Sequence, residues 1–330
     1  MKKVISRRGL LAGMAAAAAV AATGASVASA AEVGDEFAPA APVTFPADYL
    51  VDPDAKWELF ATVEGGQNIE GMNFLGDDLY IIDVLTHRVF KIEDGAATTI
   101  YEDPEGVSMP NGAKFIDDHT LLITDVRRGI VTFDLETGEY ISRATGCNGE
   151  NFRGPNDLVL DGQGGAYFTD ASGSSIINPI GNIYYVKYGD GSFEVEKFAS
   201  GFAFPNGITL SPDGQFIYVS DFYFNRIDML PSKAYPGGPE AARVLASFNG
   251  GIGPDGMLTD TEGNIIFAHF KAKEIMAVTN FGWTIATVRL PESAGIQVTN
   301  LCIHDGYLYA CEAEQSVIWR IPIKAQMLEL

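Results

Sequence analysis

"GPNDLVLDGQGGAYFTD", residues 154–170, reads as a short apolar strand, a glycine-bearing turn and a second strand. Polar Asn156 and Asp157 stand directly before the apolar run 158–160. A polar pair at this place belongs either to a turn or to a ligand site, and the remainder of the chain is needed to distinguish the two.

Five further segments of the chain repeat this pattern. Each has a polar residue, a short apolar strand, a turn with Asp or Gly, and a second strand. The six copies begin at Ile69, Pro110, Pro155, Pro205, Pro254 and Thr299. The polar residue recurs every 41 to 50 residues, with no helical periodicity of any length between the copies.

Hairpins at this spacing predict an all-β fold built from four-stranded blades. A single blade cannot bury both of its faces, so the blades must stack around an axis. We therefore expect a six-bladed β-propeller over residues 56–330, closed by the N-terminal strand "WELFATV" (57–63), which becomes the outermost strand of the last blade. A β-sandwich is the alternative, but it does not explain six in-register copies.

The N-terminal segment predicts export. Residues 1–30 hold four basic residues, an alanine-rich apolar run and the small-residue site Ala28-Ser29-Ala30, as in a signal peptide cleaved after Ala30. The paired arginines of "SRRGLLAG" indicate a twin-arginine-type signal and a periplasmic or extracellular protein. A membrane anchor is the alternative, although the apolar core is short. Residues 31–55, rich in Ala, Pro and Asp, are expected to form an exposed leader.

The net charge limits the binding partners that the protein can have, and the cysteine content limits its disulfide bonds. The chain has 22 Lys and Arg against 43 Asp and Glu, a net charge of −21, which becomes −25 without the signal and its four basic residues. Such a surface repels nucleic acid and anionic membranes, and suits a small-molecule substrate and a cation site. Three cysteines are too few for a disulfide scaffold. If Asp305-Gly306 forms a two-residue hairpin loop, Cys302 faces Tyr309, and a bridge to Cys311 is not expected.

The six marked polar residues define a candidate metal site. In a propeller they would start the innermost strands and share one mouth of the channel. They are Glu70, Asn111, Asn156, Asn206, Asp255 and Asn300. All six offer a side-chain oxygen and two are carboxylates, a set that suits one divalent cation, Ca²⁺ first, with Mg²⁺, Mn²⁺ or Zn²⁺ as alternatives. Zn²⁺ is the least favoured, because no His or Cys stands at these positions.

Turn chemistry is the competing interpretation of the same residues. Pro-Asn-Gly and Pro-Asp-Gly are ordinary turn sequences, which is sufficient for Asn111, Asn206 or Asp255 taken singly. However, Glu70 is a poor turn former, and Asn156 is followed by Asp157 rather than by Gly. A shared cation explains an oxygen donor in such different contexts better than a turn does.

The strings "IEGMNF", "GPNDLVLD", "FPNGITLSPDG" and "GPDGMLTDTEGN", in this order, resemble a known family over residues 58–325. It is the senescence-marker-protein/gluconolactonase/luciferin-regenerating-enzyme-like family of propellers, which includes regucalcin. The resemblance implies that Glu70, Asn156, Asn206 and Asp255 surround one catalytic divalent cation, with Asp255 as general base. Asn111 and Asn300 are not carried by the family motif and are weaker candidates for substrate binding.

One departure from the family concerns the substrate. Some members have an arginine two residues before the third-blade Asn, where it contacts a sugar acid, whereas Arg153 lies three residues before Asn156. Arg153 is therefore either a substrate contact or a plain surface charge. A sugar-acid lactone as substrate stays open for the same reason.

The predicted function is a divalent-metal-dependent hydrolase, a lactonase similar to gluconolactonase, that uses a metal-bound water and Asp255 as the base. The first alternative is a phosphotriesterase-like enzyme resembling diisopropyl fluorophosphatase or paraoxonase. The second is a non-catalytic, metal-stabilised binding propeller. Fold alone does not separate the three.

Overall fold

The described part of the chain is built from β-strands. The computed structural model describes residues 49–236 and 242–328. Within these ranges the helical content is one short 3-10 segment, η3 (Phe222–Phe224). No helix in the described ranges has the length and apolar character needed to cross a bilayer. The predicted all-β class is confirmed.

Four sheets each contain four antiparallel strands in chain order. The first is β6 (Pro110–Phe115), β7 (Thr120–Asp125), β8 (Gly129–Asp134) and β9 (Tyr140–Ala144). The second is β12 (Pro155–Leu160), β13 (Gly165–Asp170), β14 (Gly181–Gly189) and β15 (Ser192–Phe202). The third is β16 (Pro205–Leu210), β17 (Phe216–Asp221), β18 (Arg226–Pro231) and β19 (Arg243–Ser247). The fourth is β20 (Gly253–Thr259), β21 (Ile265–Phe270), β22 (Glu274–Val278) and β23 (Thr284–Arg289).

A larger, eight-stranded sheet joins the two ends of the described chain, in the order β2-β3-β4-β5-β1-β26-β25-β24. Its strands are β1 (Glu58–Thr62), β2 (Ile69–Leu75), β3 (Asp78–Asp83), β4 (Arg88–Glu93), β5 (Ala96–Glu102), β24 (Val298–His304), β25 (Tyr307–Glu312) and β26 (Val317–Pro322). β1 pairs with β26 in antiparallel register, and it meets β5 only at the parallel pair Thr62–Ala96. A small ribbon, β10 (Gly146–Cys147) and β11 (Glu150–Asn151), lies outside these sheets.

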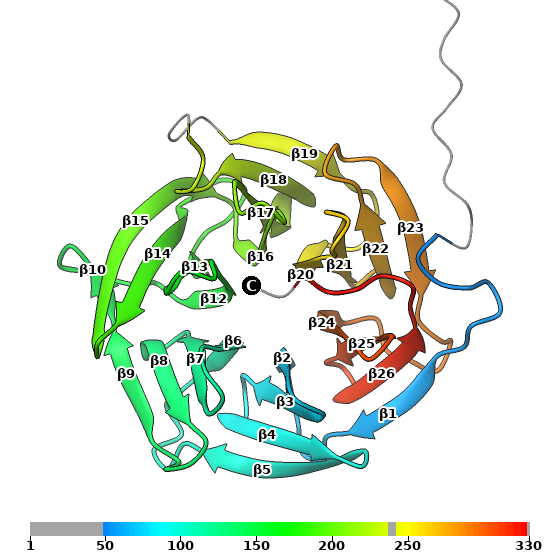
Figure 1. Cartoon of the computed structure of the whole chain (residues 1–330), viewed down its shortest axis with the longest axis horizontal. Helices are drawn as coiled ribbons and strands as arrows, with labels where there is room; N and C mark the ends of the chain where they lie inside the picture. The colour runs from blue at the N-terminus through cyan, green and yellow to red at the C-terminus, as the bar shows by residue number, and fades with distance from the viewer. Residues whose placement is uncertain (1–48, 237–241, 329–330) are drawn as a thin grey trace, which may run out of the picture. The chain divides into compact units, whose positions relative to one another are not determined.

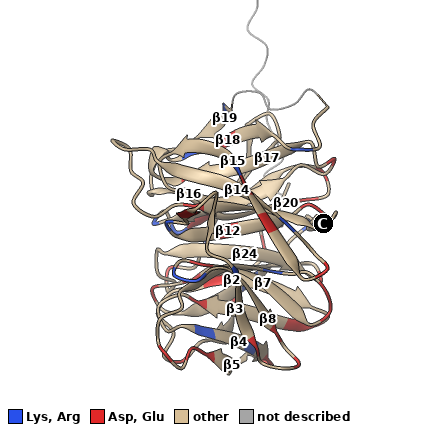
Figure 2. Ribbon diagram, turned by 90° about the vertical axis from the view of Figure 1, so that its left-hand side faces the viewer, with Lys and Arg blue, Asp and Glu red and all other residues tan. Residues whose placement is uncertain are grey.

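The sheets stand around a common axis in a propeller-like arrangement (Figure 1). The strands nearest the axis are β2, β6, β12, β16, β20 and β24, and each contacts the next, with β24 returning to β2. In the view turned by 90°, Asp and Glu mark many of the loops at the sheet edges (Figure 2). The first strand of every sequence repeat therefore lines the centre.

Packing between the faces of neighbouring sheets explains this arrangement. The second strands are buried almost along their whole length, as in β13 and β17, whereas the outer β9 and β23 alternate with exposed residues. One apolar cluster joins Tyr167 and Ile183 of one sheet to Ile217 of the next. Because each sheet buries both faces only between two neighbours, the hydrophobic effect favours the ring over isolated hairpins.

The chain before β1 differs in part from its prediction. The signal peptide and residues 31–48 of the expected leader lie outside the described residues. Within the described part of the leader, Asp52, Pro53 and Asp54 are exposed, whereas Leu50 is only 2% exposed and packs in an apolar cluster with Leu290 and Trp319.

The hairpin near the C-terminus matches its prediction. His304 pairs with Tyr307 across Asp305 and Gly306, both at positive φ, and Cys302 pairs with Tyr309. Cys302 and Cys311 are both free and buried.

Candidate metal centre

Strand pairing defines which residues occupy equivalent positions at the start of the innermost strands. In each innermost strand, one residue pairs with the last polar residue of the second strand of the same sheet. In the four-stranded sheets this residue is a proline: Pro110, Pro155, Pro205 or Pro254. In the eight-stranded sheet it is Ile69 or Val298. The next residue along the chain is the ring position. In chain order the ring is Glu70, Asn111, Asn156, Asn206, Asp255 and Thr299.

This register corrects one predicted ring member. Val298 pairs with Glu312, so Thr299 follows as the sixth ring residue and Asn300 lies one residue further on. Asn300 still reaches the ring, because its Nδ2 donates to Glu70 Oε2 at 3.4 Å. Its Oδ1 accepts from the Leu301 backbone N–H at 2.9 Å, so Asn300 offers Glu70 a donor rather than an oxygen.

A register shift includes the ring position in five of the innermost strands, and in β2 it follows directly after Glu70. In β12, for example, regular pairing stops at Pro155 and resumes at Leu158. A bulge of this kind redirects side chains and is common beside functional sites. The predicted residues Asn156, Asn206 and Asp255 all stand inside such shifts.

Two of the predicted ligands form a buried carboxylate pair in electrostatic contact. Glu70 is 7% exposed and Asp255 is 5% exposed. Burial raises the pKa of Glu70 well above its usual range, and the charges of Asp255 and Asp157 raise it further. Burial also raises the pKa of Asp255, as does the charge of Asp157, whereas hydrogen bonds from Asn206 and the Gly256 backbone lower it. The folded chain thus holds several negative charges close together.

The side-chain oxygen of Asn156 is a hydrogen-bond acceptor that no donor in the described part of the chain satisfies. Its Oδ1 is buried and has no hydrogen-bond partner among the described residues. Leaving a buried carbonyl oxygen unpaired costs about 1–3 kcal/mol unless water or an ion satisfies it. A cation shared with Glu70 and Asp255 would satisfy this oxygen and offset the repulsion between the carboxylates.

The structure adds Asp157, which was not among the predicted site residues. Burial raises the pKa of Asp157 to about 6, although the charge of Lys114 opposes the rise. Its carboxylate accepts from the backbone N–H of Leu158 at 2.9 Å and of Ile208 at 3.3 Å. It is therefore a third carboxylate in contact with Glu70 and Asp255.

Asp157 could have been recognised from the residue that follows each ring position. That residue is glycine in four repeats, at Gly71, Gly112, Gly207 and Gly256, but Asp157 and Asn300 in the other two. A Cβ on Gly112 would lie 2.8 Å from Asp157 Oδ1, and one on Gly256 would lie 2.7 Å from Asn300 Nδ2. The glycine of one strand makes room for the polar side chain of the next.

The other two candidates stand apart from this group. Arg153 is exposed, and its backbone N–H donates to Asp170 at 3.0 and 3.1 Å. Asn111 is half-buried at the second ring position, and its carbonyl would lie 2.5 Å from a Cβ on Gly71. Hydrogen bonds and electrostatic interactions connect Glu70, Asn206, Asp255, Asp157 and Asn300, and Arg153 is not part of this network.

Hydroxyl groups fix the backbone of the ring positions from the neighbouring sheet. Thr169 Oγ1 donates to the Asn206 carbonyl at 2.8 Å, and Thr124 Oγ1 donates to the Asn156 carbonyl. Ser220 does the same for Pro254, and Thr299 Oγ1 donates to the Ile69 carbonyl at 2.8 Å. The residues before or at the ring positions are thus positioned by bonds between sheets.

Fold and site together define a β-propeller with an oxygen-rich polar centre at the start of its innermost strands. The sequence model of the SMP-30/Gluconolactonase/LRE-like family matches residues 70–318. The chain belongs to this family, as its sequence motifs suggested.

Curated relatives in the family are lactonases. Lactonase drp35 of Staphylococcus epidermidis (strain ATCC 12228) is 26% identical over 234 residues, which cover 68% of this chain and 70% of the relative. Lactonase drp35 of Staphylococcus aureus (strain MRSA252) is 27% identical over 240 residues, covering 68% and 71%.

Solved structures share the fold. A gluconolactonase from Xanthomonas campestris superposes with a TM-score of 0.70 at 20% identity, covering 86% of this chain and 98% of that one. Regucalcin from Agrobacterium tumefaciens, described as a calcium-binding protein, superposes with a TM-score of 0.64 at 22% identity, covering 80% and 95%. At this identity the likeness supports the fold alone.

Proposed function

We propose that the chain is a divalent-metal-dependent hydrolase that opens lactones. Two observations carry the proposal: Asn156 Oδ1, next in the chain to Asp157, is buried and unpaired, and the carboxylates Glu70, Asp157 and Asp255 interact electrostatically. Family membership and the lactonase relatives favour a cyclic ester as the substrate class.

Glu70, Asn156, Asn206 and Asp255 would hold the cation. The four supply oxygen only, with two carboxylates, which is the ligand chemistry of Ca²⁺, with Mg²⁺, Mn²⁺ and Zn²⁺ as alternatives. The calcium-binding description of the Agrobacterium relative agrees with this choice. Asn300 orients Glu70 through its 3.4 Å hydrogen bond.

When bound, a divalent cation in such a site polarises the ester carbonyl and makes water a better nucleophile. Asp255 then serves as the general base that removes a proton from the attacking water. The hydrogen bond from Asn206 orients the Asp255 carboxylate for this transfer. A cysteine nucleophile is not needed, and burial raises the thiol pKa of Cys302 and Cys311, which keeps both protonated.

We also infer six blades, with β1 closing the ring. The eight-stranded sheet divides naturally between β1 and β5, since these strands share the one pair Thr62–Ala96, whereas β1 and β26 pair at four positions. In this view β2–β5 form the first blade, and β24, β25, β26 and β1 form the sixth.

Export remains part of the proposal. The predicted twin-arginine-type signal would deliver the protein to the periplasm or the exterior, where it would act on a small molecule without nucleic acid or membrane partners. The net charge of −21 supports this choice of partners. N-terminal sequencing of the secreted protein tests it, with Ala31 as the expected first residue.

A substrate panel tests the activity. The purified protein is assayed with aromatic, aliphatic and sugar lactones and with an organophosphate, in the presence of Ca²⁺ or of a chelator. We expect lactone hydrolysis that the chelator abolishes and Ca²⁺ restores. Asp255→Asn is expected to lower kcat by at least about 10²-fold, the usual contribution of a general base, with an unchanged far-UV spectrum.

Asp118→Asn is the matched control, because the Asp118 side chain is 93% exposed. Equal losses in both variants would contradict a catalytic role for Asp255. Faster organophosphate than lactone turnover would instead support the phosphotriesterase alternative, and Ca²⁺ binding without any turnover the binding propeller.

A further inference from the structure

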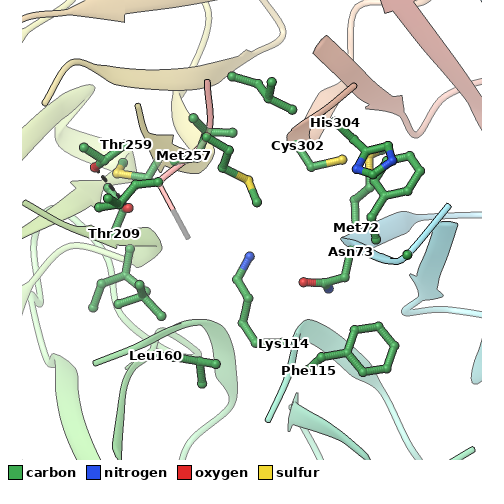
Figure 3. Close-up of a pocket in the computed structure, with 18 residues that line it drawn as sticks. Met72, Asn73, Lys114, Phe115, Leu160, Thr209, Met257, Thr259, Cys302 and His304 are labelled. Atoms are coloured by element: carbon green, nitrogen blue, oxygen red, sulfur yellow. Dashed lines mark hydrogen bonds between the residues drawn. The ribbon is translucent and has the colours of Figure 1, made fainter. Parts of the chain in front are cut away.

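A cavity of about 420 Å³ lies further along the innermost strands than the ring positions. Its walls come from the later residues of β2, β6, β12, β16, β20 and β24. They include Met72, Lys114, Leu160, Thr209, Met257 and Cys302 (Figure 3). The volume is within the range of small-molecule sites in proteins. Neither the family match nor the lactonase relatives assign a ligand to it.

Lys114 is the charged group of this cavity. Its side chain points into the middle of the space (Figure 3). None of the residues that line the cavity is acidic, and Lys114 makes no ion pair or hydrogen bond through its ammonium group within the described ranges. Lys114 is half-buried, and an ammonium in partly apolar surroundings can form a charge-assisted hydrogen bond with an anion that enters the cavity.

Other polar groups in the wall already have protein partners. The hydroxyls of Thr209 and Thr259 pair with each other at 3.1 Å. Asn73 Nδ2 donates to the carbonyls of Gly71 at 2.9 Å and Ala113 at 2.6 Å. The imidazole of His304 also lines the cavity (Figure 3); it stacks on the Phe74 ring with 4.0 Å between the ring centroids, and its Nε2 lies 3.7 Å from Asp77 Oδ1. The rest of the wall is apolar or thiol, as with Met257, Leu160 and Cys302. The cavity thus combines an apolar body with one ammonium group, which interacts electrostatically with the Asp157 carboxylate but has no ion-pair partner among the lining residues.

The C-terminal segment closes part of this cavity. Met327 and Leu328 line it, and the segment is fixed along the β20–β21 hairpin. The Leu328 N–H donates to the Thr259 carbonyl and the Thr261 N–H to the Gln326 carbonyl, both at 2.9 Å. Figure 1 shows the segment after β26 running towards β20. These bonds shield the apolar wall from solvent at this end.

We propose that the cavity is a second ligand site, which binds a small carboxylate with an apolar body. The carboxylate pairs with the Lys114 ammonium, and the apolar part contacts Met72, Leu160 and Met257. A metal ion is disfavoured by the positive charge. A sugar is disfavoured because the wall offers few unpaired polar groups. The site is separate from the proposed lactonase centre and does not depend on its activity.

Calorimetric titration of the full chain, freed of metal with a chelator, tests the proposal with two matched probes. Phenylacetate carries the charge, and phenylacetamide has nearly the same shape without it. We expect phenylacetate to bind at least about tenfold more tightly than the amide, as for one charge-assisted hydrogen bond. Equal affinities for the two probes would overturn the proposal, as would the absence of phenylacetate binding from both the full chain and a chain that ends at Leu328.

Variants locate the bound probe. Lys114→Met is expected to weaken phenylacetate binding at least about tenfold and Lys114→Arg to retain it, because only the second keeps the charge. Lys187→Met, at an exposed position of β14, is the control for general loss of charge. If Lys114→Met binds phenylacetate like the parent, or if Lys187→Met loses as much, the assignment is wrong.

A cavity-filling variant guards against loss of folding in the charge variants. Leu160→Trp keeps Lys114 but occupies the space, so it should abolish phenylacetate binding while the thermal unfolding transition stays cooperative. Retained binding by Leu160→Trp would place the probe elsewhere and overturn the proposal. Repeating the titration on a chain that ends at Leu328 keeps the test independent of the last two residues: phenylacetate binding that depends on Lys114 in either chain supports the proposal, and its absence from both overturns it.

Discussion

Asp157 shows how a single residue sets the electrostatics of the channel. It lies between the ring position Asn156 and the start of the cavity wall at Val159. The charge of Asp157 raises the pKa of both Glu70 and Asp255. The charge of Lys114 in turn lowers the pKa of Asp157. One carboxylate therefore acts on the proposed metal ligands on one side and faces the cavity lysine on the other.

Stability without metal should decrease as the pH rises. The folded pKa of Asp157, about 6, exceeds the value of 3.8 for a free aspartate, so the folded chain binds more protons than the unfolded chain between these values. The contribution is largest below pH 4 and is lost as the pH rises through 6, a change of about 3 kcal/mol in the free energy of unfolding. Glu70 and Asp255 act in the same direction.

Urea unfolding of the chelator-treated protein at pH 5 and pH 7 measures this change. Asp157→Asn should reduce the difference between the two pH values, and Asp54→Asn, at an exposed position before β1, should not. Added Ca²⁺ should stabilise the protein more at pH 7 than at pH 5, because it competes with protons for the carboxylates. An equal effect of Ca²⁺ at both pH values would contradict the ligand assignment.

Gly207 is predicted to tolerate no side chain. A Cβ there would lie 2.1 Å from the Asp255 carbonyl oxygen and 3.0 Å from the Met257 nitrogen. Because both neighbours are backbone atoms, Gly207→Ala must push β16 and β20 apart. We expect a loss of about 3 kcal/mol in the free energy of unfolding, together with weaker Ca²⁺ binding.

Gly214→Ala serves as the comparison. Its added Cβ meets nothing within 4 Å, and only the positive φ of 68° opposes it, so the expected loss is about 1 kcal/mol. Similar losses for both variants would show that the close approach at Gly207 relaxes easily.

The sequence predicted the chemistry of the site better than its register. Glu70, Asn156, Asn206 and Asp255 could be selected because an oxygen donor recurs at one place in each repeat. Asn300 was selected in place of Thr299 because the sequence does not reveal the register shift between Val298 and Leu301. Strand pairing showed that Asn300 is equivalent to Asp157, so the place of Asn300 could not be inferred from spacing.

At the scale of elements, the hydroxyl bonds between sheets explain how separate strands hold one site. Thr169 of β13 accepts from the Asp157 N–H at 3.0 Å and donates to the Asn206 carbonyl at 2.8 Å. The Thr169 side chain therefore links two innermost strands, β12 and β16, at Asp157 and Asn206. Thr124 joins β6 and β12 in the same way.

Thr169→Val removes both bonds and keeps the shape of the side chain. Since two buried backbone groups lose their partner, the free energy of unfolding should fall by about 3 kcal/mol in denaturant titrations. Ca²⁺ affinity should fall too, because Asn206 loses its support. Thr98→Val, at an exposed position of β5, should change stability by less than about 0.5 kcal/mol. A loss of stability without any change in Ca²⁺ affinity would separate Thr169 from the site.

Elements with strong local signals were predictable, and those set by distant contacts were not. The Asp305-Gly306 hairpin formed as expected because its turn chemistry is local. The small ribbon of β10 and β11 was not foreseen. Neither was the burial of Leu50, whose partners Leu290 and Trp319 are more than two hundred residues away in the sequence.

The stability of the described fold depends on the pairing of its first strand, β1, with its last strand, β26. β1 pairs with β26, and the Trp57 indole donates to the Arg289 carbonyl of β23 at 2.9 Å. Ala61 and Val63 are buried in a cluster that includes Ile318. Because every sheet is covered by its neighbours, an open edge at β26 would expose apolar surface on both sides of the gap.

Truncation tests this closure. A chain that begins at Phe45 keeps Leu50, Trp57 and β1, so we expect it to unfold at nearly the same temperature as the full chain. A chain that begins at Glu64 lacks all three, and should either fail to fold or unfold at a temperature lower by at least about 15 °C, as for a loss of several kcal/mol. Circular dichroism on both chains measures the difference, and Leu50→Ser in the full chain should give an intermediate loss. If the chain from Glu64 unfolds like the chain from Phe45, β1 does not close the ring, and the sheet of β24, β25 and β26 is stable with its edge exposed.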